Sequence, residues 1–293
     1  MGCTFKTLRV VYGDFTLGVH GEGFDYIFSY AQGGLESLVK NGYEWLYRCP
    51  KPTFWRATTD NDRGSKFHIK SGSWLAADMF IECKDVEVIT DGKSQGKPCA
   101  PENNKYGGDV FAENVIVKYV YETITTPATT VEVVYSVDNK GKIAVNVSYK
   151  GAKGWPQLPV FGLRFIMPTL ADKYTYEGLS GETYPDRMAG AEKGIFEIDD
   201  ISLTNYLVPQ ECGMRMGTEW LEVTRHTSLN NCRKGNSNQI LRIEKKDKGF
   251  AFSCLPYTAS EIENATHHEE LPPARRTVLC IYGAVRGVGG IGQ

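Results

Sequence analysis

The sequence of 293 residues lacks the features that define several large classes of protein. Its 33 lysines and arginines nearly balance its 35 aspartates and glutamates, so the strongly basic surface of a nucleic-acid-binding protein is not predicted. The apolar run over residues 278–285 ends at Arg286, far short of the roughly 20 residues that a membrane-spanning helix needs. Residues 1–6 lack the charged and apolar regions of a secretory signal. We therefore expect a cytoplasmic protein with neither a nucleic-acid nor a membrane partner.

Paired cysteines and the common catalytic motifs are also missing. The eight cysteines are scattered without a Cys-x-x-Cys pair, which predicts free thiols rather than a metal site or a disulfide framework. There is no Gly-x-Ser-x-Gly elbow and no phosphate-binding Walker loop. The glycine-rich run 287–292 is not followed by a helical pattern, so it does not indicate a dinucleotide site.

Alternating apolar and polar residues, separated by turn residues, are the main pattern that is present. Gly13-Asp14, Asn41-Gly42 and residues 138–141 (DNKG) are typical of turns between antiparallel strands. Helical patterns are confined to residues 74–80 and to 257–264, where Thr258 and Glu261 have the spacing of a capping box. The sequence predicts an all-β, antiparallel sandwich forming a single domain over residues 1–293. The expected strands are 8–12, 15–19, 24–30, 36–39, 43–47, 86–89, 115–123, 130–137, 142–149, 160–167, 249–253 and 277–282.

The first of three polar segments that interrupt this alternation is 51–64 (KPTFWRATTDNDRG). Arginine forks pair bidentately with carboxylates, so Arg56 or Arg63 with Asp60 or Asp62 predicts a network that holds an irregular loop. The alternative is that the carboxylates bind a sugar hydroxyl or Ca²⁺. A calcium loop is not favoured, because the bidentate glutamate that it requires does not follow at the right spacing.

The other two segments are 174–187 (YTYEGLSGETYPDR) and 264–276 (NATHHEELPPARR). Glu177 and Glu182 could form the carboxylate pair of a glycosidase, but the distance between them is not fixed by the sequence. His267 and His268 are adjacent and therefore face different directions, which argues against a shared metal ion. A surface loop with one histidine bonded to a carboxylate is the favoured reading of this third segment.

Four motifs together resemble one family. Residues 52–57 (PTFWRA) with 60–62 (DND) resemble the opening of the C-terminal domain of the large β-galactosidases of glycoside hydrolase family 2. Residues 182–187 (ETYPDR), 206–213 (YLVPQECG) and 285–290 (VRGVGG) resemble further segments of that domain, although 177–181 match its glycine-rich lead-in less well. The resemblance runs over almost the whole chain and is greatest to the separately encoded small subunit of heterodimeric β-galactosidases, as in lactobacilli.

The resemblance implies a large antiparallel super-sandwich, similar to galactose mutarotase. It also implies a partner, a large subunit that carries the catalytic carboxylates, the Mg²⁺ and Na⁺ sites and most galactoside contacts, so no catalytic residue, metal ligand or cofactor is predicted on this chain. Galactoside would be bound only in the complex. In the family the last glycine strand leads into Asp-Ser-Trp, but here residues 291–293 are IGQ. We therefore expect a truncated C-terminus and little β-galactosidase activity.

Two alternatives stay open: a stand-alone carbohydrate-binding sandwich that stacks sugars on Trp55, Tyr184 and Trp220, and a mutarotase-like protein. For the favoured subunit, the polar loops are the predicted partner-facing or substrate-proximal regions, because loops at the end of a rigid sandwich commonly carry recognition. The predicted residues are Trp55, Arg56, Asp60, Asn61, Asp62, Arg63, Tyr184, Asp186, Arg187, His267, His268 and Glu269.

Overall fold

A computed structural model describes residues 7–100, 110–151, 153–230 and 238–289. These residues divide into two compact units. Unit 1 comprises residues 1–50 and 80–153, and unit 2 comprises residues 51–79 and 154–293. Each unit is described by itself, and the single domain predicted over 1–293 stays a prediction.

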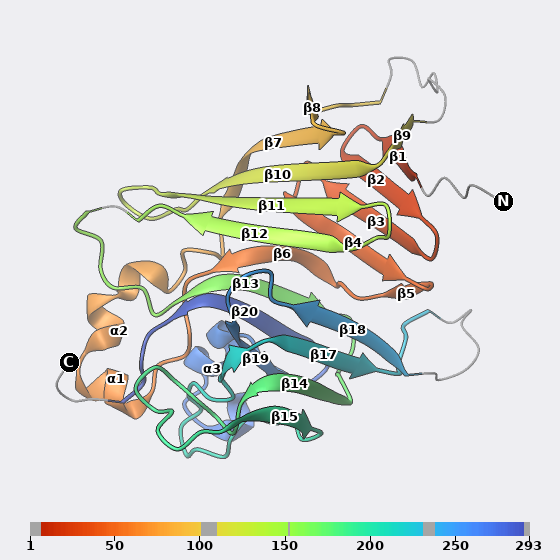
Figure 1. Cartoon of the computed structure of the whole chain (residues 1–293). Coiled ribbons are helices and arrows are strands. Elements are labelled where there is room, and N and C mark those ends of the chain that lie inside the picture. The colour runs from red at the N-terminus through yellow and green to blue at the C-terminus, as the bar shows by residue number, and fades with distance from the viewer. Residues whose placement is uncertain (1–6, 101–109, 152, 231–237, 290–293) are drawn as a thin grey trace. The chain divides into compact units, whose positions relative to one another are not determined.

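Unit 1 consists of two antiparallel sheets (Figure 1). Their facing sides form the core, where the Tyr26 hydroxyl donates to the carbonyl of Gly141 at 2.7 Å and the Phe28 and Tyr135 rings meet at 5.6 Å. The first sheet has the order β5-β4-β3-β2-β1-β9, with β1 Leu8–Tyr12, β2 Thr16–Gly21, β3 Phe24–Ser29, β4 Gly34–Lys40, β5 Tyr43–Glu44 and β9 Val110–Ala112. The second has the order β12-β11-β10-β7-β8, with β7 Glu82–Thr90, β8 Lys93–Gly96, β10 Asn114–Glu122, β11 Thr130–Asp138 and β12 Ile143–Tyr149.

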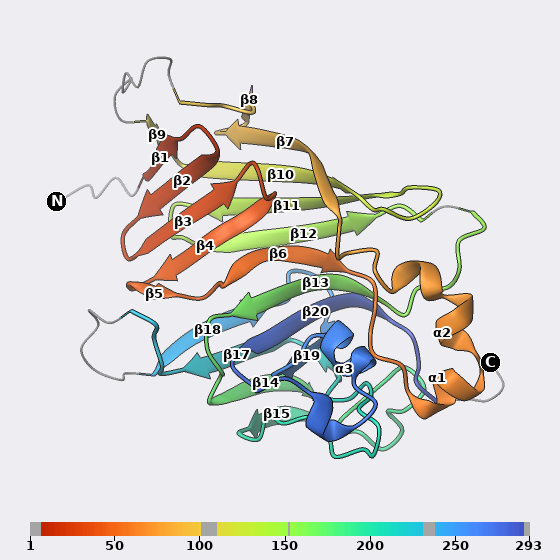
Figure 2. The same ribbon diagram turned by 180° about the vertical axis from the view of Figure 1, so that it is seen from behind.

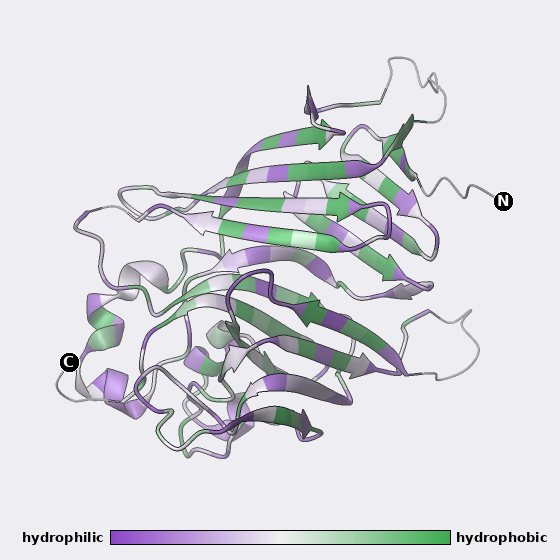
Figure 3. Ribbon diagram, in the orientation of Figure 1, coloured by the Kyte–Doolittle hydropathy of each residue, from purple (hydrophilic) through white to green (hydrophobic). Residues whose placement is uncertain are grey.

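Alternation dictates how these strands are buried. Along β10 every second side chain, from Val115 to Tyr121, is completely buried while the residues between them are partly exposed. Figure 3 shows the same alternation as bands of opposite hydropathy along the strands. Asn41 and Gly42 both have positive φ, at 51° and 71°, which is the backbone that a two-residue hairpin turn requires. The turn predicted there is confirmed.

Unit 2 also contains two antiparallel sheets, which pack through the rings of Tyr174, Tyr176 and Phe252. One has the order β16-β19-β20-β13-β6, with β13 Val160–Met167, β16 Arg215–Thr218, β19 Phe250–Leu255, β20 Thr277–Val285 and β6 Arg48–Thr53, of which residues 51–53 belong to unit 2. The other has the order β15-β14-β17-β18, with β14 Lys173–Leu179, β15 Lys193–Ile198, β17 Trp220–Arg225 and β18 Gln239–Glu244. The short helices are α1 Asp60–Gly64, α2 Phe67–Lys70, α3 Ala259–Asn264, and the 3₁₀ turns Gly72–Trp74 and His268–Glu270; Figure 2 shows α3 clearly.

The predicted all-β, antiparallel sandwich class is confirmed. The capping box predicted at Thr258 and Glu261 is also confirmed, at the start of α3. Two local predictions are wrong. Residues 174–179 are not part of a polar loop but form β14, because Tyr174 and Tyr176 face the core. Residues 60–64 form a short helix rather than an irregular loop, because Thr59 caps it.

Within the described residues no helix is long and apolar enough to cross a membrane. The cysteines Cys49, Cys83, Cys99, Cys212, Cys254 and Cys280 are free thiols, as predicted for these positions. Residues 290–293, on which the predicted C-terminal truncation rests, lie outside the described part of the chain.

Candidate functional site

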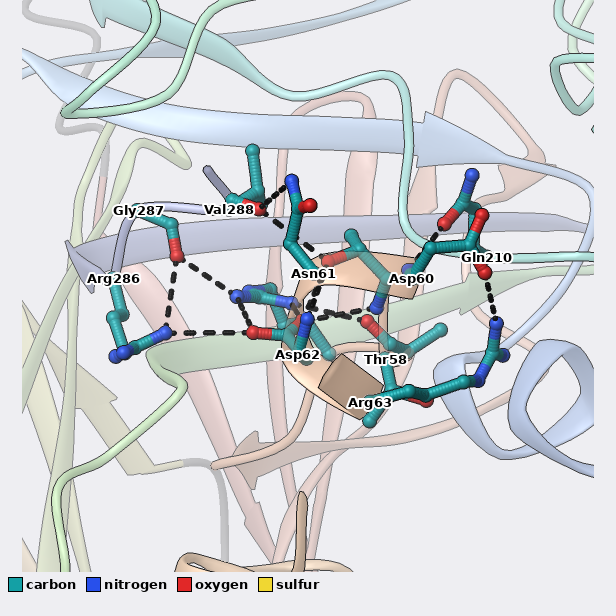
Figure 4. A network of polar contacts seen from close by, with 12 residues as sticks. Thr58, Asp60, Asn61, Asp62, Arg63, Gln210, Arg286, Gly287 and Val288 are labelled. Carbon is teal, nitrogen blue, oxygen red and sulfur yellow. Dashed lines mark hydrogen bonds and ion pairs between the residues drawn. The ribbon is translucent and has the colours of Figure 1, made fainter. Parts of the chain in front are cut away.

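The four motifs that carry the family resemblance come together in unit 2, and Figure 4 shows the contacts among three of them. The extended segment after β6 leads into α1, and the chain that follows β20 lies against it. The turn 182–187 and the segment 206–213 supply further contacts. We call this region the motif junction, defined as residues 55–63, 184–187, 209–211 and 286–289.

A buried ion pair between Arg56 and Asp62 lies at the centre of the motif junction. Arg56 Nη1 donates to Asp62 Oδ2 at 2.6 Å and Nη2 donates to Oδ1 at 3.2 Å, which is a bidentate pairing. The two side chains are only 1% and 2% exposed to solvent. The sequence predicted such an arginine–carboxylate network, and the structure identifies Arg56 and Asp62 as the pair.

Asp62 also organises the start of α1. Its Oδ2 accepts hydrogen bonds from the Thr59 amide at 2.9 Å and the Thr59 hydroxyl at 3.0 Å, completing a capping box. Burial opposes ionisation of this carboxyl, but the hydrogen bonds and charge of Arg56 outweigh burial and hold the pKa of Asp62 below its ordinary value. One carboxylate therefore neutralises a buried arginine and caps a helix.

The chain after β20 is held on both sides of its backbone. Arg56 Nη2 donates to the Gly287 carbonyl at 3.0 Å, and Asn61 Nδ2 donates to the Val288 carbonyl at 3.2 Å. From the other side, Asp186 accepts from the amides of Val288 and Gly289 at 3.0 and 2.6 Å. A Cβ atom at Gly287 would lie 2.5 Å from the Asp186 carboxyl carbon, so any other residue would have to displace the Asp186 carboxylate from its present position.

We expect Asp186→Ala to release this segment. Charge-assisted hydrogen bonds contribute about 1.5–3 kcal/mol each, so hydrogen exchange at the amides of Val288 and Gly289 should accelerate about tenfold or more. Asp247→Ala is a matched control, because Asp247 is also exposed but makes no hydrogen bond within the described residues. Equal exchange rates in the two variants would contradict an anchoring role for Asp186.

A second buried acid, Glu211, lies beside the ion pair and was not among the predicted site residues. It is 8% exposed, and its Oε1 accepts no hydrogen bond from the described residues. Burial raises the pKa of Glu211 to about 7, assisted by the charges of Glu182 and Asp62 and opposed by Arg56. The same carboxyl, together with burial, raises the pKa of Tyr184, which is 1% exposed.

Glu211 also borders a cavity of about 20 Å³, with Trp55, Arg164, Ser253 and Tyr282 among its other walls. That volume suits about one water molecule and is far too small for a sugar ring. The predicted alternative of a mutarotase-like protein gains no support from this cavity.

The outer part of the motif junction joins α1 to the segment 209–211. The Asp60 amide donates to Gln210 Oε1 at 2.9 Å, and Arg63 Nη2 donates to the Pro209 carbonyl at 3.5 Å. Arg63 also pairs with the exposed carboxylate of Asp60 at 3.0 Å. These contacts join the DND motif of α1 to the PQE residues of the motif YLVPQECG, although the two motifs lie far apart in the sequence.

Trp55 is buried, at 3% exposure, and its Nε1 donates to Glu263 Oε2 of α3 at 3.2 Å. Tyr184 is equally enclosed, and the Trp220 ring lies beneath the Arg242 guanidinium at 4.4 Å. Because the Trp55 and Tyr184 rings are buried, the predicted stacking platforms for sugar are wrong for these two residues. At Trp220, which is partly exposed, the Arg242 guanidinium already covers one face of the ring.

The remaining predicted residues lie apart from the ion pair. Arg187 is largely exposed, with its Nη1 at 3.9 Å from Glu182. His267, His268 and Glu269 are exposed around a 3₁₀ turn, and the hydrogen bonds there stay within residues 266–271. Within the described residues these three therefore make no hydrogen bond to the motif junction; the third segment approaches it through Leu271, which packs against the apolar cluster that contains Ala57.

Sequence reasoning omitted Gln210, Glu211, Glu263 and Arg286 from the site. The first two stand in the motif YLVPQECG, which was a usable signal. Arg286 lies over the Phe67 ring at 3.8 Å and donates to Asp62 at 3.4 Å, a contact that depends on tertiary packing. Glu263 accepts from the Thr58 amide and hydroxyl, both at 2.7 Å, and nothing in its local sequence indicates this.

The described residues thus define an all-β sandwich protein with a buried polar junction. Most hydrogen-bonding groups of Arg56 and Asp62 are occupied by other parts of the chain, which suits holding segments in place rather than turning over a substrate.

Comparison with known proteins agrees with this class. The sequence model of the family described as β-galactosidase small chain matches residues 20–292. The chain is 58% identical over 291 residues to a β-galactosidase small subunit from Latilactobacillus sakei, covering 99% of this chain and 92% of that protein. It is 34% identical to a β-galactosidase of Halalkalibacterium halodurans and 32% identical to one of Streptococcus thermophilus, covering 97% of this chain in both cases.

The chain therefore belongs to the β-galactosidase small-chain family, and the predicted resemblance is confirmed. It spans about a quarter of the length of the β-galactosidases from Halalkalibacterium halodurans and Streptococcus thermophilus.

Proposed function

We propose that this chain is the non-catalytic small subunit of a β-galactosidase and completes the enzyme by assembling with a large catalytic subunit. The observation that carries the proposal is the 58% identity to a β-galactosidase small subunit over nearly the full length of both chains. The reaction is hydrolysis of terminal β-galactosides such as lactose. The nucleophile and acid/base carboxylates of that reaction, and its Mg²⁺ and Na⁺ ions, are proposed to belong to the large subunit.

The motif junction supports a role in assembly. It fixes the backbone of residues 286–289 through Arg56, Asn61 and Asp186, which gives this segment a defined position before any partner binds. A pre-ordered segment loses less conformational entropy on association, and association is correspondingly tighter. We propose a cytoplasmic location for the assembled enzyme, and neither nucleic acid nor membrane as a partner.

The test is co-expression with the large subunit that accompanies the Latilactobacillus sakei small subunit. We expect the two chains to co-elute on size exclusion, whereas this chain alone should elute without the partner and release no nitrophenol from o-nitrophenyl β-galactoside. Activity should depend on the large subunit. Elution of the chains as separate species, or hydrolysis by this chain alone, would overturn the proposal.

A further inference from the structure

Unit 2 contains a second, larger pocket that the motif junction does not use. Its volume is about 290 Å³, close to the lower end of the range for small-molecule sites and suited to a single sugar-sized ring. The floor comes from Tyr174 of β14, Arg215 of β16 and the end of β19, and one wall is the segment 200–205 between β15 and β16. Glu182 and Gly213 close another side.

Arg215 is the unusual group in this pocket. Its Nε donates to the Tyr174 hydroxyl at 3.4 Å, and its guanidinium carbon lies 5.9 Å from the centre of the Tyr176 ring. Within the described residues its two terminal amino groups make no hydrogen bond, and no carboxylate pairs with it. Partly buried arginines normally have such partners, so these donors are available to a ligand.

Acceptors around Arg215 are already fixed in position. Glu182 Oε2 accepts from the Gly213 amide at 2.7 Å, and Asp200 Oδ1 accepts from the Ser202 amide at 3.0 Å.

The guanidinium of Arg215 stays charged in this setting. Burial opposes its charge, but the neighbouring Tyr174, Tyr176 and Glu182 outweigh burial and raise the pKa of the guanidinium. Both signs of charge are therefore held in place around the pocket.

The chemistry of the walls selects the ligand class. Two carboxylates against one guanidinium give a formal charge of −1, which disfavours an anion. Arginine and Asn205 offer donors, the carboxylates offer acceptors, and Ser202 and Thr204 offer both. Neighbouring hydroxyl groups on one ring satisfy such a mixture, because each hydroxyl donates one hydrogen bond and accepts others. We propose that this pocket, built around Arg215, binds a neutral monosaccharide-sized polyol.

The test uses the isolated full-length chain, so its outcome does not depend on assembly with a large subunit. Methyl β-D-galactopyranoside and methyl β-D-glucopyranoside are titrated to tens of millimolar while the amide signals of Ser202 and Gly213 are followed by NMR. We expect saturable shifts with at least one probe. Arg215→Met should raise the dissociation constant at least tenfold, whereas Arg242→Met, a change at an arginine stacked on Trp220 outside the pocket, should leave it unchanged.

Asn205→Ala keeps the test valid if Arg215→Met fails to fold. Asn205 is exposed and makes no side-chain hydrogen bond within the described residues, so this variant should fold normally and raise the dissociation constant several-fold. Absence of saturable shifts with both probes, or binding that neither pocket variant weakens, would overturn the proposal. Either result leaves the proposed subunit function untouched.

Discussion

Asp62→Ala is expected to lower the free energy of unfolding of unit 2 by about 3–5 kcal/mol, because it leaves the Arg56 guanidinium buried without its counter-charge. The substitution also removes the acceptor that caps α1 at Thr59 and a contact of Arg286. Urea unfolding followed by tryptophan fluorescence measures the loss, since Trp55 and Trp74 report on this unit.

Asp60→Ala is the matched control for Asp62→Ala. Asp60 belongs to the same helix and also pairs with an arginine, but its side chain is 77% exposed. Exposed pairs contribute about 0–1 kcal/mol, so this variant should unfold almost as the parent does. Equal effects of the two substitutions would contradict a central role for the buried pair.

A double variant distinguishes the cost of leaving the Arg56 charge buried without a partner from the contribution of the Arg56–Asp62 ion pair itself. Replacing Arg56 with methionine and Asp62 with leucine removes both charges, and apolar replacements of buried pairs are often tolerated. We expect the double variant to recover part of the stability that Asp62→Ala loses. It should still loosen the chain at Gly287, because the Gly287 carbonyl loses its hydrogen bond from Arg56, while Asn61 and Asp186 continue to hold Val288 and Gly289.

The contrast between β10 and β14 explains how much of the fold could be predicted. Along β10, valines and tyrosines alternate with polar residues, and the sequence predicted this strand to within one residue. The tyrosines of β14 alternate in the same way, but Glu177 and Gly178 made the segment resemble a polar loop. Gly178 is favoured by close packing rather than by a turn, since a Cβ there would lie 3.2 Å from the Met216 carbonyl oxygen, closer than an ordinary van der Waals contact.

The candidate site was predictable only in part for a similar reason. The pairing of Arg56 with an aspartate of DND follows from local chemistry, because five residues separate the arginine from Asp62. The contacts of Asp186 with Val288 and of Trp55 with Glu263 join residues that are 102 and 208 positions apart. No periodicity or spacing in the sequence predicts such pairs. The solvent exposure of the residues in them does not follow from residue type either. That is why buried Trp55 and Tyr184 were predicted as open surfaces.

Glu211 gives the motif junction a titratable group in the neutral range. Its carboxyl interacts electrostatically with Arg56, which precedes α1, and with Asp62 of α1. It also interacts with Glu182 and Tyr184 of the turn after β14. On β20 it interacts with Cys280 and Tyr282. The Arg56 guanidinium favours the ionised form of Glu211, but the charge of this guanidinium is already neutralised by Asp62. Burial therefore dominates, and the pKa of Glu211 rises from 4.5 to about 7.

The raised pKa makes stability depend on pH with a defined sign. The folded protein binds the Glu211 proton more tightly than the unfolded chain does, so this contribution is fully present below pH 4.5 and is lost as the pH rises through about 7. The shift corresponds to about 3 kcal/mol between those limits. Glu211→Gln removes the ionisation while keeping the shape of the side chain. The variant should match the parent near pH 4.5 and exceed its unfolding free energy by about 3 kcal/mol above pH 7.

Urea unfolding of the parent, Glu211→Gln and Glu269→Gln at intervals from pH 4.5 to 8 measures this difference. Glu269 is exposed, so its variant should follow the parent at every pH. A gap between parent and Glu211→Gln that stays constant with pH would show that Glu211 does not titrate in this range. A gap that opens with a midpoint between pH 4.5 and 7 would identify the buried acid of the YLVPQECG motif as a proton-linked element of the motif junction, because no other group changes charge between those two chains.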